Sequence, residues 1–371
     1  MSTSQWSPAM VAAIDQQPPP PAPAIARAEV EPLIPGMDLW DFWPVQDQAG
    51  HAAVIDGGTL FMLLSSPALP NPDDRHALAR IRLMHRVGDE WRDCGNLLPD
   101  GWSPGSREWS GSAVIGADAR TVTLYFTAAG MRGEAELGFE QRLFEAEAEL
   151  AEDDGPVLVR WSAPREIVAP DGTHFMRDMA GGGALGTIKA FRDPAYFRDP
   201  VDDREYILFT GSLAQSHSDW NGAVGLVERI DGRWTLGAPL VSADGLNNEL
   251  ERPHVIVHAG RYYLFWSTQR KVFAPTGPTG PNGLYGMVAD RIAGPWIPLN
   301  GSGLVLANPP HAPFQAYSWL VLPDLSVLSF ADILELDRAP RDADEARRHF
   351  GGSPAPVLHL AITGDRAVLA P

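Results

Sequence analysis

The chain has 371 residues, of which 44% are hydrophobic, and a formal net charge of −18. The length allows one large domain or two to three ordinary ones, with enough apolar side chains for a core. The acidic charge argues against nucleic acid and anionic membranes as partners, and the one cysteine, Cys94, excludes an internal disulfide and a cysteine-based zinc cluster.

Residues 1–28 are expected to form an extended arm, because the segment Gln16 to Ala24, QQPPPPAPA, is a polyproline spacer. Residues 29–371 are expected to form a single domain. The first basic residue is Arg27 and no apolar run follows the start, so no classical export signal is predicted. No stretch approaches the roughly 18 to 20 apolar residues of a membrane span. A cytoplasmic location is the default expectation, with export by a non-classical route as the alternative.

Beyond the arm, alternating apolar and polar runs predict antiparallel hairpins. The turns are predicted at residues 116–119, Asp231-Gly232, Ala259-Gly260, Pro323-Asp324 and Gly364-Asp365. No helical pattern separates the strands, which excludes βαβ units, and the best helix candidate is the short segment from Asp342 to Phe350. The fold class is therefore all-β, while the strands alone leave a sandwich, a barrel and a propeller open.

Clusters of polar and aromatic residues recur along the chain and favour the propeller. They are WDFWP (residues 40–44), REWSGSA (107–113), FRDP (191–194), NELERP (248–253) and FQAYSW (314–319). The clusters follow one another at steps of roughly 60 to 85 residues, which suits one propeller blade of about 40–50 residues plus loops. Five such clusters indicate a five-bladed β-propeller whose blades each send one cluster to a shared axial pocket.

Two aspartates in these clusters are candidate catalytic residues. Asp41 lies between Trp40 and Trp43, where a carboxylate is costly unless it is hydrogen-bonded. It is either a turn residue beside core tryptophans or a nucleophile on an aromatic floor that suits a sugar ring. Asp193 belongs to a tandem RDP pattern that is typical of turns, but Arg192 beside it also suits an ion pair in a cleft.

The segment ELERP raises a second question, because strand alternation would place Glu249 and Glu251 on one face. Like charges raise one carboxyl pKa, which is what a general acid needs near neutral pH. The alternative is a solvated edge with Arg252 nearby. Acidic clusters, tryptophans and arginines in an all-β chain without a metal signature together favour a glycosidase that uses a pair of carboxylates.

Other chemistries fit the sequence less well. Ser110 and Ser112 lie outside any G-x-S-x-G elbow, which argues against a serine hydrolase. The glycine-rich GGGALG at residues 181–186 lacks the Lys-Ser/Thr pair and the helix of a phosphate loop. The histidines form no H-x-x-x-H pair, so neither a metal nor another cofactor is predicted.

The ordered motifs WDFWP, EWSGSA, FRDP, ELERP and QAYSW resemble glycoside hydrolase family 68, the family of levansucrases, inulosucrases and bacterial β-fructofuranosidases. The resemblance runs from about residue 38 to about residue 332. It implies a five-bladed β-propeller with a deep axial pocket, in agreement with the spacing of the clusters.

The resemblance implies a role for each matching residue. Asp41 would be the nucleophile, Glu251 the acid/base and Asp193 the stabiliser of the transition state. The substrate-binding residues would be Trp40, Trp109, Ser110, Arg192, Glu249, Arg252, Gln269 and Tyr317. A covalent fructosyl-enzyme with retention of configuration requires the carboxyls of Asp41 and Glu251 to lie about 5–5.5 Å apart.

Two departures from the family pattern bear on activity. Levansucrases usually carry Arg or His at the position of Gln269. An uncharged side chain there would hold an acceptor sugar less firmly, so water would compete better for the fructosyl intermediate. We therefore expect a β-fructofuranosidase that cleaves sucrose and transfers fructose to short acceptors, giving fructooligosaccharides, as a side activity. The alternative is a levansucrase that makes levan, with Arg270 or Lys271 replacing the missing charge. Asn248 replaces an Asp that binds structural calcium in some members, so that site is expected to be absent or weakened.

Two other functions compete with that of a sucrose-acting enzyme. One is a related five-bladed glycosidase that acts on other furanosides, such as arabinans, but it would not share the WDFW, EWSGSA and QAYSW motifs. The other is a sugar-binding propeller without catalysis, which would tolerate the loss of a carboxylate, whereas all three are present.

Overall fold

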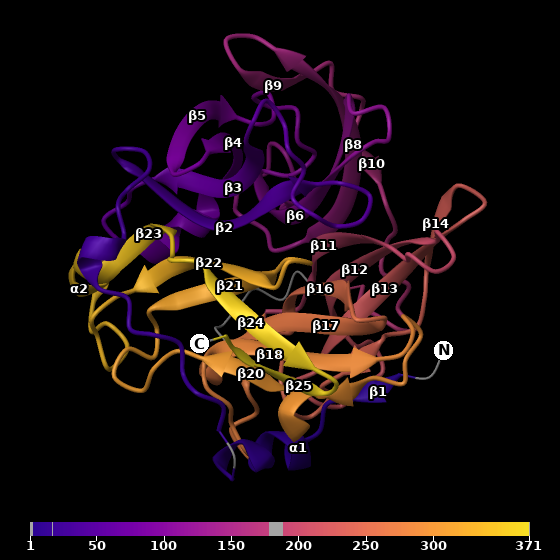
Figure 1. Cartoon of the computed structure of the whole chain (residues 1–371), viewed down its shortest axis with the longest axis vertical. Helices are drawn as coiled ribbons and strands as arrows, with labels where there is room; N and C mark the ends of the chain where they lie inside the picture. The colour runs from indigo at the N-terminus through magenta and orange to yellow at the C-terminus, as the bar shows by residue number, and fades with distance from the viewer. Residues whose placement is uncertain (1–2, 17, 178–187, 371) are drawn as a thin grey trace.

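The structure, a computed structural model, describes residues 3–16, 18–177 and 188–370. The glycine-rich segment 181–186 lies outside these described residues. Antiparallel strands are the main regular secondary structure of the described chain, and they follow one another in sequence order around a common centre (Figure 1). The all-β propeller expected from the sequence is confirmed.

The first two meanders share one sheet, because β2 and β6 pair in parallel through Val45 and Ala113. The first meander contains β2 (Met37–Gln46), β3 (Thr59–Pro67), β4 (Arg80–Val87) and β5 (Glu90–Asn96). The second contains β6 (Arg107–Ile115), β7 (Thr121–Ala129), β8 (Gln141–Glu152), β9 (Pro156–Val159) and β10 (Arg165–Glu166).

Three further meanders complete the described sheets. The third contains β11 (Phe191–Arg198), β12 (Glu205–Ser212), β13 (Gly222–Ile230), β14 (Arg233–Leu236) and β15 (Val241–Ser242). The next contains β16 (Glu251–His258), β17 (Arg261–Thr268), β18 (Gly283–Ala289), β19 (Ile297–Pro298) and β20 (Leu304–Ala307). The last contains β21 (Ala316–Val321), β22 (Ser326–Ile333), β23 (Phe350–Pro354), β24 (Leu358–Thr363) and β25 (Arg366–Leu369).

Helices are short and lie between strands. They are α1 (Pro8–Ala12), η1 (Ala13–Asp15), η2 (Arg27–Glu29), η3 (Pro72–Ala77), η4 (Arg270–Val272), η5 (Leu299–Gly301) and α2 (Ala343–His349). The predicted helix is therefore confirmed as α2, whose N-cap Asp342 accepts a hydrogen bond from Glu345 N at 2.8 Å. The predicted tight turns also form, since strands end and begin on either side of each one. No helix among the described residues is long and apolar enough to cross a membrane.

Each motif cluster lies on, or immediately before, the first strand of a meander, and that strand is irregular at the motif. The pairing register shifts between Leu39 and Phe42 in β2, Trp109 and Gly111 in β6, Arg192 and Ala195 in β11, Glu251 and His254 in β16, and Tyr317 and Leu320 in β21. A β-bulge bends its strand and re-aims a side chain, so these shifts turn the motif residues away from the ordinary alternation.

Backbone strain accompanies three of the bulges. Asp193, Arg252 and Ser318 have φ angles of 62°, 51° and 61°, in the left-handed region that residues with a side chain rarely adopt. Such a conformation costs of order 1–3 kcal/mol and persists only where the surrounding structure enforces it. The bulged ends of the first strands are therefore built for the placement of side chains rather than for the stability of the sheet.

The N-terminal arm packs against the propeller, and it is not extended throughout, because residues 8–15 form α1 and η1. Its β1 (Ser4–Gln5), labelled in Figure 1, pairs in parallel with β15. Trp6 is 1% exposed, and its Nε1 donates to Ser302 O at 3.0 Å. The ring packs edge-on against Trp266 and Tyr285, with centroids 5.3 and 5.1 Å away. The arm thus adds an aromatic side chain to the core between the third and fourth meanders.

Replacement of Trp6 by alanine should lower the free energy of unfolding by about 3–5 kcal/mol, because it leaves a cavity among aromatic rings and an unpaired Ser302 carbonyl. Urea denaturation followed by fluorescence measures the change. Val54→Ala is the matched control, since Val54 is 81% exposed and its loss should cost under about 0.5 kcal/mol. Equal stability of Trp6→Ala and Val54→Ala would show that the arm is not part of the folded core.

Candidate active site

Asp41 lies at the bulge of β2 and is held by the bulge of β6. Ser110 Oγ donates a hydrogen bond to Asp41 Oδ2 at 2.5 Å, and Ser110 itself is buried. The Asp41 side chain is half-buried, so one carboxylate oxygen is fixed by a neighbour while the residue still reaches the solvent-accessible surface. A carboxylate with this restricted orientation can act on a bound molecule from a fixed direction.

Arg192 brings the remaining candidate carboxylates together. Its Nη2 lies 2.8 Å from Glu251 Oε1 and 3.6 Å from Glu249 Oε2, and its Nε lies 3.6 Å from Asp193 Oδ2. Burial alone would lower the pKa of Arg192, but the charges of the three carboxylates raise it above its usual value. The guanidinium therefore remains a permanent positive charge among three acidic groups.

Asp193 connects this arrangement to Asp41. Its Oδ2 accepts hydrogen bonds from Thr210 Oγ1 at 2.9 Å and from the backbone N of Arg252 at 3.3 Å. Burial raises the pKa of Asp193 to about 6, with the Arg192 charge opposing and the Glu251 and Asp41 charges reinforcing the rise. Because Asp193 interacts with both other carboxylates, the residues predicted to form one catalytic group lie around one site.

Glu249 and Glu251 both face Arg192, although not for the reason expected from the sequence. The alternation argument is wrong here, because β16 begins only at Glu251 and its register shifts immediately afterwards. Burial raises the pKa of Glu249 to about 7, and the neighbouring charge of Glu251 adds to the rise. The crowding of the two carboxylates is therefore real, and it helps Glu249 to hold a proton near neutral pH.

Tyr317 holds the other side of Glu251. Its hydroxyl donates a hydrogen bond to Glu251 Oε2, so Glu251 is held by Arg192 through one oxygen and by a phenol through the other. Gln269 follows β17 and lies beside the Tyr317 hydroxyl, where it interacts with that group. Gln269 thus lies beside Tyr317, which holds Glu251, and its substrate-binding role stays a prediction.

Two tryptophans of the motifs contact His76. Trp40 is 2% exposed and packs edge-on against His76, with ring centroids 5.8 Å apart. Trp109 is half-buried, and its Nε1 donates to His76 O at 3.4 Å. Trp109 therefore leaves part of its ring available to a ligand, whereas Trp40 acts mainly as support beneath Asp41.

Arg252 does not take the substrate-binding position predicted for it. Its Nη1 donates to Ser318 O and Oγ at 3.1 and 2.7 Å, and its Nη2 donates to Phe42 O at 2.8 Å. The bulge at Arg252 turns the side chain between neighbouring inner strands. The residue ties β16 to β2 and β21, and the buried guanidinium has no free face for a sugar.

Sequence reasoning missed several charged groups near these carboxylates. Burial raises the pKa of Asp332 to about 6, with Arg75 and Lys271 lowering it and Asp41 raising it. His76 lies among Arg75, Lys271 and Arg192, and its burial together with those charges lowers its pKa well below the usual value. Asp332, His76 and Arg75 belong to none of the quoted motifs. Only the position of Asp332, at the end of the stretch that resembles the family, could have indicated it.

Asn248, which replaces a calcium-binding Asp of some family members, lies beside the ammonium group of Lys189. Asn248 Oδ1 accepts a hydrogen bond from Lys189 Nζ at 3.2 Å. Among the described residues, no group of three or more histidine, cysteine, aspartate or glutamate side chains is arranged to hold a metal ion. The absence of a metal site stays a prediction from the sequence.

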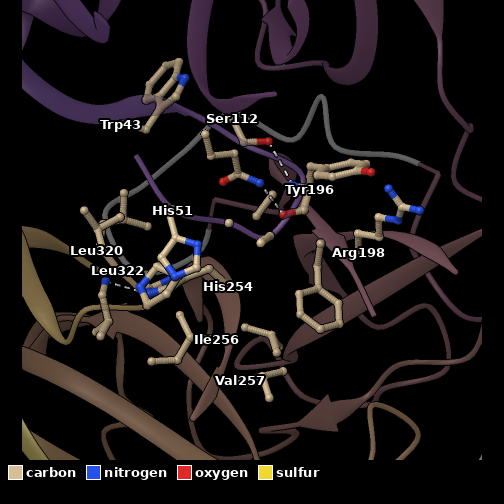
Figure 2. A pocket seen from close by; sticks show the side chains of 18 of the residues that line it. Trp43, His51, Ser112, Tyr196, Arg198, His254, Ile256, Val257, Leu320 and Leu322 are labelled. Carbon is tan, nitrogen blue, oxygen red and sulfur yellow. Dashed lines mark hydrogen bonds between the residues drawn. The ribbon is translucent and has the colours of Figure 1, made fainter. Parts of the chain in front are cut away.

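A cavity of about 580 Å³ lies farther along the inner strands (Figure 2). Trp43, Ser112, Tyr196, His254 and Leu320 are among the residues that line it. Of the predicted site residues, only Asp193 and Arg252 reach this space. Asp193 therefore borders this cavity, and the other candidate carboxylates do not line it.

A family model described as Levansucrase/Invertase matches residues 1–224 and 219–370 of the chain. A curated levansucrase of Pseudomonas savastanoi pv. glycinea is 29% identical over an alignment that covers 98% of this chain and 89% of that protein. The match thus extends over nearly the whole length of both proteins.

Solved structures agree with the fold. An inulosucrase from Halalkalicoccus jeotgali bound to kestose has a TM-score of 0.90 at 35% identity, over 99% of this chain and 95% of that one. A β-fructofuranosidase from Microbacterium saccharophilum K-1 has a TM-score of 0.85 at 23% identity, over 100% and 83% of the two chains. At that identity, the second similarity shows the fold alone.

Proposed function

Because the chain belongs to the levansucrase and invertase family, glycoside hydrolase family 68, we propose that it transfers the fructosyl unit of sucrose by a retaining mechanism. The chain is a sucrose-acting glycoside hydrolase or fructosyltransferase. The observation that supports the proposed mechanism best is the meeting of Asp193, Glu249 and Glu251 around Arg192, with Asp41 close to Asp193.

The first step assigned to the site is displacement at the anomeric carbon. Asp41, oriented by Ser110, attacks the anomeric carbon of the fructosyl unit, and the bond to the glycosidic oxygen breaks. Glu251 donates its proton to that oxygen, which leaves as part of glucose. The product of this step is a covalent fructosyl ester on Asp41. The separation of about 5–5.5 Å between the carboxyls of Asp41 and Glu251 stays a prediction of this mechanism.

The second step reverses these roles. Glu251, now ionised, takes a proton from an acceptor hydroxyl, and the acceptor oxygen attacks the anomeric carbon and releases Asp41. Asp193 is assigned to the fructosyl hydroxyls, where its partial negative charge stabilises the positive charge that develops on the ring. Arg192 keeps Glu251, Glu249 and Asp193 in place through both steps.

The identity of the acceptor separates the two candidate functions. Relatives named levansucrase and inulosucrase support transfer to a sugar, and we propose levansucrase-type fructosyl transfer as the main activity. Lys271 supports this proposal, because its charge acts on Glu249, His76 and Asp332 and can replace the charge that Gln269 lacks. Hydrolysis to glucose and fructose is the second candidate, and the observation that favours it is the uncharged Gln269 beside Tyr317.

Replacement of Asp41 by asparagine should lower glucose release from sucrose by more than about 1,000-fold, since no other carboxylate can form the ester. An enzymatic glucose assay measures the loss. Asp47→Asn is the control, because Asp47 has a side chain that is 46% exposed and should retain full activity. Retention of more than a tenth of the wild-type rate in Asp41→Asn would contradict the assignment of the nucleophile.

Replacement of Lys271 by methionine should reduce the ratio of transferred to free fructose at high sucrose by roughly threefold, because water competes better when an acceptor loses a charged hydrogen-bond donor. Chromatography of sucrose incubations gives the ratio. Arg270→Met serves as the neighbouring control and should leave the ratio unchanged. A wild-type enzyme that yields free fructose almost exclusively would favour hydrolysis over the levansucrase proposal.

A further inference from the structure

Lys189 carries an ammonium group that is surrounded by oxygen atoms from separate segments. Its Nζ donates to Asp219 O, to Asn221 Oδ1 at 2.8 Å and to Asn248 Oδ1 at 3.2 Å. Asn221 is 3% exposed and Asn248 is fully buried. Burial lowers the pKa of Lys189, while the charges of Asp219 and Glu249 oppose that change. All three donors of the ammonium are therefore used within the protein.

The amide of Asn248 links this ammonium to the active site. While its Oδ1 faces Lys189, its Nδ2 donates to Ile188 O at 2.9 Å and to Glu249 Oε1 at 3.3 Å. Rotation of the amide by half a turn would place an oxygen against Glu249 and Ile188 O and a donor against the ammonium. The positive charge of Lys189 thus selects the orientation in which Asn248 donates to Glu249.

Glu249 is in turn packed against the acid/base machinery. Arg192 from β11 lies 3.6 Å away, and Glu251 from β16 and Tyr317 from β21 interact with its charge. Lys271 from η4 contributes a further positive charge. The uncharged amide of Asn248 donates a hydrogen bond to Glu249 Oε1.

The backbone of Lys189 is also fixed by the second meander. Lys189 O accepts a hydrogen bond from Gln141 Nε2 at 2.8 Å, and Gln141 Oε1 accepts from Arg192 Nη1 at 3.4 Å. Gln141 is fully buried. The ammonium is therefore anchored from both sides, with its chain segment held against β8 and its charge held against the loops before β13 and β16.

We propose that Lys189 is a positioning residue of this enzyme, whose ammonium orients Asn248 so that Glu249 stays ionised beside Arg192 and Glu251. The inference rests on the proposed function for its catalytic consequence. When Glu249 is ionised, its negative charge lies beside Glu251, the group that must deliver a proton to the leaving oxygen. Loss of the ammonium frees the amide, weakens the support of the ionised form and makes Glu249 easier to protonate.

The sign of the pH effect follows from this linkage. A positive charge and a donated hydrogen bond both lower a carboxyl pKa, so their removal raises the pKa of Glu249. The pH at which Glu249 takes up a proton then rises. Activity that requires an ionised Glu249 is lost at a higher pH than in the wild type, and the acid limb of kcat/KM moves upward.

Two variants test the proposal in the full-length protein. Lys189→Met should lower kcat/KM for sucrose at the optimum by roughly tenfold and move the acid limb upward by about one pH unit. Lys189→Arg, which keeps the charge, should restore most of the wild-type profile. Asn248→Asp keeps an acceptor for Lys189 but removes the donor to Glu249, and it should move the acid limb in the same direction. Arg229→Met, at a surface ion pair with Glu205, is the control for loss of a cation.

A readout that does not depend on turnover separates this inference from the proposed function. NMR titration with carbon-13-labelled glutamate, assigned with Glu249→Gln, should show the Glu249 signal titrating at higher pH in Lys189→Met. A wild-type protein inactive on sucrose would refute the proposed function, while the titration would still test the role of Lys189. A reduced melting temperature with an unshifted acid limb and an unshifted Glu249 titration would overturn the inference and leave Lys189 as a structural residue only.

Discussion

The guanidinium of Arg192 is the group on which the candidate site depends. Three carboxylates surround it, and burial raises the pKa of Asp193 to about 6 and that of Glu249 to about 7. Without a fixed positive charge, such a group of acids would repel one another or take up protons. With it, Asp193, Glu249 and Glu251 stay together around one cation. Permanent charge, planar geometry and several donors make arginine suited to this role.

The β-bulges in the first strand of each meander place the side chains of the candidate site. A regular inner strand would alternate its side chains, and half of every motif would face away from the channel. The bulges at the start of the inner strands break this alternation, and strained φ angles at Asp193, Arg252 and Ser318 fix the result. The cost is met by internal ties such as the hydrogen bonds of Arg252 to β2 and β21. The strained backbone positions thus lie in the same motifs as the candidate catalytic side chains.

Much of the fold could be predicted from the sequence, because hairpin turns and the short helix depend on local residues such as Asp231, Gly232 and Asp342. Asp41, Asp193, Glu251 and Tyr317 could be identified because the motifs around them resemble a known family. Arg252 and the relation of Glu249 to Glu251 were misjudged, since a bulge leaves no periodic signal. Trp6 and Lys189 were missed because their roles come from contacts with residues 302 and 248, which no local pattern reveals.

In the proposed mechanism, Asp41 forms a covalent bond to the sugar while Arg192 holds Glu249 and Glu251. Acid quenching of the enzyme during turnover of sucrose, followed by peptide mapping with mass spectrometry, can detect this bond. A hexosyl increment is expected on the peptide that contains Asp41, at a level that falls when sucrose is exhausted. An increment on Asp193 or Glu251 instead, or turnover with inversion at the anomeric carbon, would contradict it.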